Sequence, residues 1–120
     1  MPHDTLESLR QRLAQFAAER DWDQFHSPKN LAMALSGEAA EIIEHFQWLT
    51  EEQSRKLAPD KQQAVSLELA DVLIYLLRLA DKLNIDLIAA AYTKIQINET
   101  RYPTARVKGD ARRAAEYPPE

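Results

Sequence analysis

Cysteine is absent from the sequence, and positive charge is in short supply. Without cysteine the chain has no disulfide framework, no thiol nucleophile and no thiolate metal site. The 15 lysines and arginines are outnumbered by 19 aspartates and glutamates, which gives a net charge of −4. A protein that binds a nucleic-acid backbone needs a basic patch, so this balance argues against that function.

Long apolar runs are absent too. No stretch reaches membrane-spanning length, and the first twenty residues lack the apolar core of a signal peptide. We therefore expect a cytoplasmic protein. With 120 residues, of which 45% are apolar and 28% charged, the chain has the composition of one ordinary soluble domain.

The hydrophobic pattern predicts an all-α fold. Apolar residues recur at helical spacing in four stretches, whereas neither strand alternation nor a hairpin dipeptide occurs. The four helices that we predict cover residues 5–20, 28–49, 60–83 and 87–101. We therefore expect a four-helix bundle.

Apolar residues mark two faces of the predicted helix 60–83, and one small domain has too few helices to cover both. Self-association is the simplest remedy, so we predict an obligate helical oligomer. The bundle domain should cover residues 1–103. Residues 104–120 are almost free of large aliphatic side chains, which predicts a flexible C-terminal tail.

Two acidic steps carry the chemistry. Glu38 and Glu41 lie three residues apart, as do Glu68 and Asp71, so on a helix each pair shares one face. The second pair lies in a stretch so apolar that the helix must be buried almost all round. Buried carboxylates are paired or bind a metal, and few cations lie nearby in the sequence. Four carboxylates therefore predict a divalent-cation site, and Mg²⁺ is favoured because it leaves positions for substrate phosphates.

Aromatic residues extend these acidic faces, and basic residues lie on another predicted helix. By helical periodicity, Trp48 lies on the face of Glu38, and Tyr75 on that of Glu68. An acidic cluster at one end of a cleft and aromatic rings at the other match a nucleoside triphosphate. Lys94 and Arg101, from the last predicted helix, could reach phosphate oxygens.

These motifs resemble the all-α nucleoside triphosphate pyrophosphohydrolases of the MazG type, and most closely their dCTP pyrophosphatase branch. The ExxE and ExxD steps are common to the superfamily. The branch is indicated by three stretches, which are FAAERDWDQFHSPKNLAMALSGEAAEIIEHFQW, ELADVLIYLL and KIQINETRYP. Together they span most of residues 16–103.

The resemblance implies Mg²⁺-dependent cleavage of dCTP or a 5-modified dCTP between the α and β phosphates, as house-cleaning of the nucleotide pool. It implies a homotetramer whose sites use helices of neighbouring subunits. Four residues would bind metal: Glu38, Glu41, Glu68 and Asp71. Five would surround the nucleotide: Trp22, His26, Trp48, Tyr75 and Asn98. In the branch, the first helix brings a histidine towards the base, whereas this chain has Leu13 in that stretch.

For the catalytic step we expect Glu41, rather than the deeper Glu38, to orient or deprotonate the attacking water. Gly37 precedes this pair and is either a tolerated weak point in the helix or a place of close approach. The alternatives are a broader pyrophosphatase acting on dUTP or noncanonical nucleotides, and a non-catalytic helical assembly module. A di-iron bundle is disfavoured because the i+3 partners are acidic rather than histidine.

Overall fold

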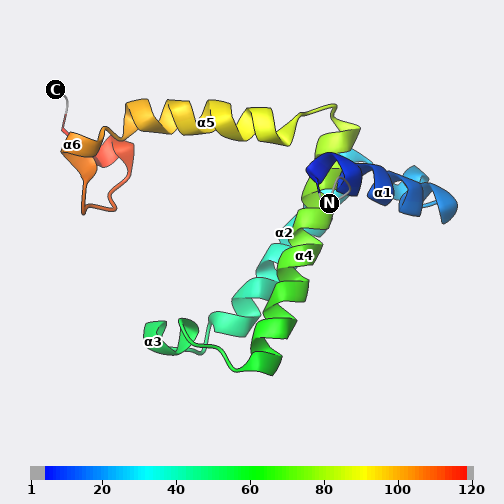
Figure 1. The fold of residues 1–120 in the computed structure, drawn as a ribbon, viewed down its shortest axis with the longest axis horizontal. Coiled ribbons are helices and arrows are strands. Elements are labelled where there is room, and N and C mark those ends of the chain that lie inside the picture. Colours follow the sequence, from blue (N-terminus) through cyan, green and yellow to red (C-terminus); the bar gives the residue numbers. More distant parts are fainter. Residues whose placement is uncertain (1–4, 119–120) are drawn as a thin grey trace. The chain divides into compact units, whose positions relative to one another are not determined.

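The computed structural model describes residues 5–118. Over this range the chain is helical and contains no β-strand, which confirms the predicted all-α class. The elements are α1 (Leu6–Glu19), η1 (Asp23–Phe25), α2 (Pro28–Phe46), α3 (Glu51–Ser54), α4 (Pro59–Lys82), α5 (Leu87–Arg101), α6 (Thr104–Val107) and η2 (Ala114–Glu116) (Figure 1). The first four residues of the predicted domain and the last two of the predicted tail lie outside the described residues.

The chain divides into two compact units, which meet between Ile85 and Asp86. The first unit contains α1, η1, α2, α3 and α4, and the second contains α5, α6 and η2. The boundary predicted after residue 103 lies inside the second unit.

Helices α2 and α4 form the centre of the first unit. They lie side by side and run antiparallel, so the start of α2 is close to the end of α4 (Figure 1). Helix α1 packs against α4 near that same end. The fully buried Leu31 of α2 and the buried Val65 and Leu77 of α4 belong to the core of this unit.

Helices α2 and α5 each begin at a residue whose side chain caps the helix. Ser27 accepts a hydrogen bond from the Asn30 backbone N–H, and Pro28 occupies the first position of α2. Asp86 caps α5 by accepting from the Ala89 N–H. Helix α2 ends at Phe46, three residues before the predicted end, and the chain then turns into the short helix α3.

Helix α1 ends in a turn that brings the chain back onto itself. Asp21 adopts a left-handed conformation with φ of 55°, and the N–H groups of Asp21 and Trp22 donate to the carbonyls of Ala18 and Ala17. This is the hydrogen-bond pattern of a Schellman motif. The turn places Trp22 against Phe16, with ring centroids 5.7 Å apart in an edge-to-face arrangement.

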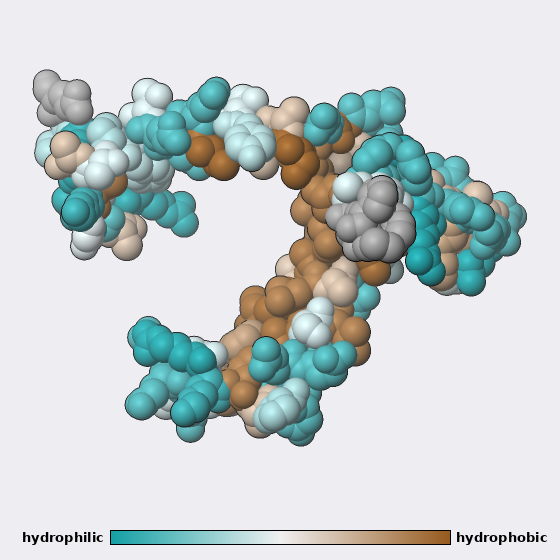
Figure 2. Space-filling view, viewed as in Figure 1, coloured by the Kyte–Doolittle hydropathy of each residue, from teal (hydrophilic) through white to brown (hydrophobic). Residues whose placement is uncertain are grey.

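Large apolar side chains remain exposed on the central helix pair. Ile43 of α2 and Leu67 and Leu69 of α4 are each more than half exposed. The surface along α2 and α4 is correspondingly hydrophobic in Figure 2. Among the helices of the described residues, none combines the length and the apolar character that crossing a bilayer requires.

The predicted tail contains helical turns of its own within residues 104–118. The backbone N–H of Ala114 donates to the Tyr102 hydroxyl over 2.9 Å. The guanidinium of Arg112 stacks on the Tyr117 ring with 4.6 Å between the guanidinium carbon and the ring centroid. These contacts fold the segment back towards the end of α5.

Candidate active site

Three of the four predicted carboxylates meet between α2 and α4. Glu38, Glu41 and Glu68 can each offer one oxygen such that the three oxygens lie within 4.8 Å of one another. Glu38 and Glu41 come from one face of α2, and Glu68 comes from the neighbouring face of α4. The i, i+3 spacing and the antiparallel pairing of the two helices therefore produce the cluster.

Two carboxylate oxygens of this cluster are buried and have no hydrogen-bond partner. They are Oε2 of Glu38 and Oε2 of Glu68. Within residues 5–118, none of the observed ion pairs involves a member of the cluster. A buried carboxylate without a partner is energetically unfavourable, so these oxygens are suited to a cation. This argues against a purely structural role in salt bridges.

Crowding of negative charge changes the acidity of the cluster. Burial, together with the interaction with Glu41 and the charges of Asp71 and Glu68, raises the pKa of Glu38 from 4.5 to about 7. The pKa of Glu68 is also raised, first by its interaction with Glu41 and then by burial. Both shifts have the sign expected of carboxylates that lack a compensating positive charge.

The cluster matches the ligand preferences of a hard divalent cation. Mg²⁺ and Ca²⁺ bind oxygen ligands at about 2.0–2.6 Å, so oxygens on one ion lie within about 4–5 Å of one another. The three glutamate oxygens satisfy this limit. Asp71 is not a member of the three-residue group, although its negative charge contributes to the raised pKa of both Glu38 and Glu68. Its role as a fourth ligand stays a prediction.

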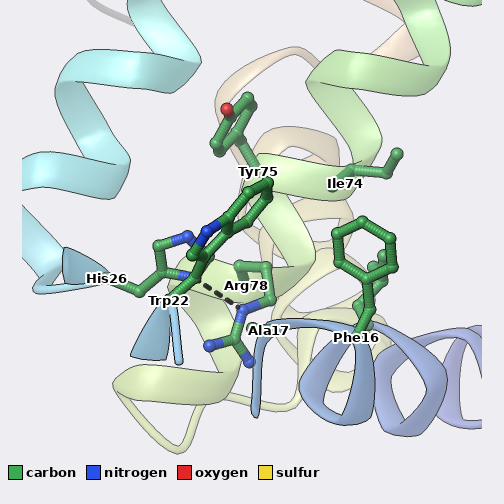
Figure 3. Close-up of a pocket in the computed structure, with 8 residues that line it drawn as sticks. Phe16, Ala17, Trp22, His26, Ile74, Tyr75 and Arg78 are labelled. Carbon is green, nitrogen blue, oxygen red and sulfur yellow. Dashed lines mark hydrogen bonds between the residues drawn. The ribbon is translucent and has the colours of Figure 1, made fainter. Parts of the chain in front are cut away.

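A second feature, a pocket of about 190 Å³, lies between α1, η1 and α4 (Figure 3). Its walls are mostly apolar and aromatic, and its lining residues are Leu13, Phe16, Ala17, Trp22, His26, Ile74, Tyr75 and Arg78. Pockets that hold a whole ligand of drug size measure roughly 300–1,000 Å³. The pocket therefore has room for a planar ring such as a base, but not for an entire nucleotide.

The polar side of this pocket is an ordered network of charges. Arg78 is only 3% exposed, and its Nε donates to Nδ1 of His26 over 3.2 Å (Figure 3). Its terminal nitrogens donate to Asp23 over 3.0 Å and to Asp81 over 3.3 Å. Burial, and then the positive charge of Arg78, lower the pKa of His26 below its ordinary 6.5.

Comparison with known proteins places this arrangement in a family. The profile of the MazG-like family matches residues 33–115, a stretch that includes all four carboxylates. The chain belongs to the MazG-like family. It is 44% identical to the human protein dCTP pyrophosphatase 1 over 119 residues, which cover 98% of this chain and 70% of the human protein. The bovine dCTP pyrophosphatase 1 is also 44% identical, over 116 residues that cover 95% of this chain.

A solved structure agrees with the family. The crystal structure of a pyrophosphatase from Archaeoglobus fulgidus superposes with a TM-score of 0.77 at 41% sequence identity. The match covers 81% of this chain and 91% of the archaeal one. The family resemblance inferred from the acidic steps and the RDWDQFH, FQW and RYP stretches is therefore confirmed.

In this MazG-like chain, the pocket and the carboxylate cluster share helix α4. Glu68 and Tyr75 are seven residues apart, which corresponds to roughly 10 Å along a helix. Trp22, His26 and Tyr75, three of the residues predicted around the nucleotide, line the same pocket. Leu13 lines it too, and thus provides an apolar wall from α1.

Trp48 does not reach this pocket within one chain. It follows the end of α2 and is 87% exposed. Because α2 and α4 are antiparallel, moving from Glu38 towards Trp48 leads away from Tyr75 (Figure 1). The expectation that Trp48 and Tyr75 lie at the same end of a cleft is therefore not met by the residues of a single subunit.

The three predicted residues of the last long helix lie in the second unit. Lys94 and Arg101 are exposed on α5, and Asn98 between them is partly covered. Their part in nucleotide binding stays a prediction.

Sequence reasoning missed Arg78 and Asp23. The available signal was periodicity, since residues 71, 75, 78 and 82 fall on one stripe of α4 at spacings of four, three and four. An arginine between Leu77 and Leu79, at the end of an apolar helix, should have indicated a buried cation with a carboxylate partner.

Proposed function

We propose that this protein is a Mg²⁺-dependent nucleoside triphosphate pyrophosphohydrolase of the nucleotide-metabolism type. Its substrate would be dCTP or a 5-modified dCTP, and its products the nucleoside monophosphate and pyrophosphate. The activity is supported by membership in the MazG-like family and by 44% identity to mammalian proteins named dCTP pyrophosphatase 1. We place this house-cleaning reaction in the cytoplasm.

The observation that carries the proposal is the position of two complementary sites on one helix. Helix α4 contributes Glu68 to the carboxylate cluster, and it contributes Tyr75 and Arg78 to the pocket about two to three turns further on. The cluster suits a cation that binds phosphates, and the pocket suits a flat ring. A nucleoside triphosphate has these two parts joined by a sugar.

Glu38, Glu41 and Glu68 would hold the magnesium, with Asp71 as a further ligand. When bound, the cation neutralises phosphate charge and withdraws the negative charge that develops in the transition state. The two buried oxygens without partners would be among the ligand atoms, and the carboxylates must lose their protons before they can bind the ion.

Glu41 would orient the attacking water and accept its proton. Glu41 is exposed, whereas Glu38 is partly buried and has a raised pKa. An exposed carboxylate at the edge of the cluster can contact both water and substrate, which a general base requires. Glu38 would contribute chiefly by holding the cluster together.

Trp22, His26 and Tyr75 would bind the base. Trp22 packs against Phe16 in an edge-to-face arrangement, which keeps the indole in place before a ligand arrives. A stacked base gains from aromatic surface on its face, and His26 adds a polar group at the edge of the pocket.

The complete site would require a homotetramer with a closed helical bundle. The exposed apolar side chains of α2 and α4 indicate an uncovered face, and a second copy of the chain is its natural occupant. In such an assembly the nucleotide bound at the carboxylate cluster and the pocket would also contact Trp48, Lys94, Asn98 and Arg101.

Leu13 favours one alternative, a pyrophosphatase of broader base preference. A leucine at the pocket wall offers no hydrogen bond that could distinguish one base from another. Hydrolysis of dUTP or noncanonical nucleotides at rates similar to that of dCTP would support this alternative.

A panel of ribo- and deoxynucleoside triphosphates, each assayed with and without Mg²⁺, tests the proposal. We expect Mg²⁺-dependent turnover with dCTP and 5-methyl-dCTP as the preferred substrates. If no nucleotide is hydrolysed and Mg²⁺ with nucleotide leaves the melting temperature unchanged, the protein is a helical assembly module instead.

A further inference from the structure

Arg78 is the most buried charged side chain in the described residues. A guanidinium at 3% exposure needs partners for its donors, and it has three, on two other segments and on its own helix. Asp23 of η1 and Asp81 of α4 accept from its terminal nitrogens. Its Nε donates to Nδ1 of His26.

The two carboxylates that hold Arg78 are themselves held by other cations. Asp81 also accepts from Arg10 of α1 over 2.8 Å, and Asp23 also accepts from Lys82 of α4. The guanidinium is thus fixed by α1, η1 and α4 together. A planar, always charged group that is fixed in this way has a defined direction for every N–H.

This geometry determines the protonation of His26. Arginine can only donate hydrogen bonds, so Nδ1 of His26 must accept and carries no proton. In neutral imidazole the proton then lies on Nε2. Within residues 5–118, Nε2 has no hydrogen-bond partner among those observed, so this donor is available to a ligand in the pocket.

The surrounding charges favour the same neutral form. Arg78 and Lys82 of α4 face His26 and lower its pKa, after the larger effect of burial, whereas Asp23 of η1 raises it. Tyr75 is the other titratable side chain that lines the pocket beside His26 and Arg78.

We propose that Arg78 is a positioning residue that fixes His26 as its Nε2–H tautomer and thereby makes the base pocket select a ring with a hydrogen-bond acceptor facing it. The inference rests on the proposed function and adds a source of base preference. A histidine whose proton can lie on either ring nitrogen could present a hydrogen-bond donor or an acceptor to the ligand. With Arg78 in place it offers only a donor.

Among pyrimidines this favours cytosine. The ring nitrogen N3 of cytosine is an acceptor, whereas N3–H of uracil and thymine is a donor. A uracil ring in the same pose would place two donors against each other, and a buried unpaired donor is unfavourable. The pocket would therefore discriminate even though Leu13 provides no polar group.

The first test measures the tautomer directly. Nitrogen-15 NMR of the 120-residue protein without nucleotide reports which ring nitrogen of each histidine carries the proton. His26→Asn identifies the His26 signals, and His45 serves as an internal reference. We expect an unprotonated Nδ1 and a protonated Nε2 at pH 7. An Nδ1–H tautomer, an equal mixture or an imidazolium overturns the proposal whether or not the protein hydrolyses nucleotides.

The second test removes the donor. In Arg78→Met, we expect a mixture of tautomers, a higher His26 pKa and an approximately tenfold smaller ratio of kcat/KM for dCTP to kcat/KM for dUTP, the loss of about one hydrogen bond. Arg78→Lys, which restores a donor, should recover part of the ratio. Lys56→Met removes an exposed cation outside this network and should leave the tautomer and the ratio within twofold of wild type.

Arg78→Met with unchanged tautomer and unchanged ratio would refute the positioning role. If Arg78→Met does not fold, the wild-type spectrum and Arg78→Lys decide. If the protein hydrolyses no triphosphate, the proposed function fails, and binding of deoxycytidine against deoxyuridine, followed at the His26 signals, decides the inference. Equal binding of the two nucleosides would overturn it.

Discussion

At the scale of single residues, the carboxylates of Glu38 and Glu68 define what the site can do. Each has a buried oxygen without a partner, and each has a raised pKa. Such groups destabilise a metal-free protein and become favourable when a cation binds them. Their arrangement thus lowers the stability of the metal-free protein and provides a binding site, as is typical of functional sites.

Replacing Glu68 by Gln separates these two effects. We expect turnover to fall at least about a hundredfold, because a ligand of the catalytic ion is lost. The metal-free melting temperature at pH 8 should stay equal or rise by a few degrees, because one negative charge leaves a crowded cluster. Thermal unfolding with EDTA and an activity assay with Mg²⁺ measure both.

Glu44→Gln is the matched control, since Glu44 is an exposed carboxylate of α2 outside the cluster. It should keep activity within about twofold, as surface substitutions usually do. Full Mg²⁺-dependent turnover in Glu68→Gln would contradict the assignment of the metal site.

The raised pKa of Glu38 predicts how pH acts on the metal-free protein. The folded state holds this proton up to about pH 7, whereas the unfolded chain releases it near 4.5. The folded state therefore binds more protons in this window, so the stabilisation is complete below about pH 4.5 and is lost as the pH rises through 7. Mg²⁺ affinity should change in the opposite direction and increase up to about pH 7.

Isothermal titration of Mg²⁺ into the nucleotide-free protein at several pH values measures this linkage. The Glu38→Gln variant should show a weaker dependence between pH 5 and 7. A wild-type affinity that is independent of pH over this range would show that Glu38 is not a ligand that must first lose a proton.

At the scale of elements, sequence periodicity predicted much of what is observed. Apolar stripes identified α1, α2, α4 and α5, and the i, i+3 spacing placed each pair of carboxylates on one face of its helix. The direction of packing was harder to anticipate. The antiparallel pairing separates Trp48 from Tyr75, and this depends on tertiary contacts that helical periodicity does not encode.

The network around Arg78 was missed for a related reason. Its partners Asp23 and His26 are more than 50 positions away in sequence. They reach Arg78 only because the turn after α1 directs η1 towards α4. Such contacts follow from the path of a loop, for which composition is a weak guide.

Gly37 offers a test at this scale. A Cβ at this position would meet nothing within 4 Å inside the chain, so the single subunit has no need for glycine there. Gly37→Ala should increase the free energy of unfolding by about 0.5–1 kcal/mol, because alanine favours the helix. Urea denaturation measures the change.

Gly109→Ala is the contrasting control. Gly109 has φ of +80°, which strains any L side chain, so no gain in stability is expected there. A loss of stability in Gly37→Ala together with dissociation of an oligomer would show that Gly37 contacts a neighbouring subunit.

At the scale of the whole molecule, exposed apolar surface indicates assembly. Ile43, Leu67 and Leu69 are 60%, 59% and 53% exposed, respectively, which is unusual for large aliphatic side chains clustered on one helix pair. The proposed homotetramer would bury them and would also bring Trp48 to a site in another subunit.

Light scattering after size exclusion tests this assembly. We expect a mass close to four times the 13.7 kDa of one chain. Leu67→Glu should dissociate it and reduce activity at least about tenfold, because a charge cannot be buried without a partner. Gln62→Glu, an exposed change on the same helix, should leave the mass unchanged. Full activity in a wild-type monomer would contradict the shared-site proposal.

The most direct test of the central claim is the identity of the first products from dCTP. Phosphorus NMR of dCTP incubated with the protein and Mg²⁺ distinguishes cleavage at the two phosphoanhydride bonds. We expect dCMP and pyrophosphate in equal amounts from the first turnover, with no reaction in EDTA or in Glu68→Gln. Orthophosphate and dCDP as first products would contradict it.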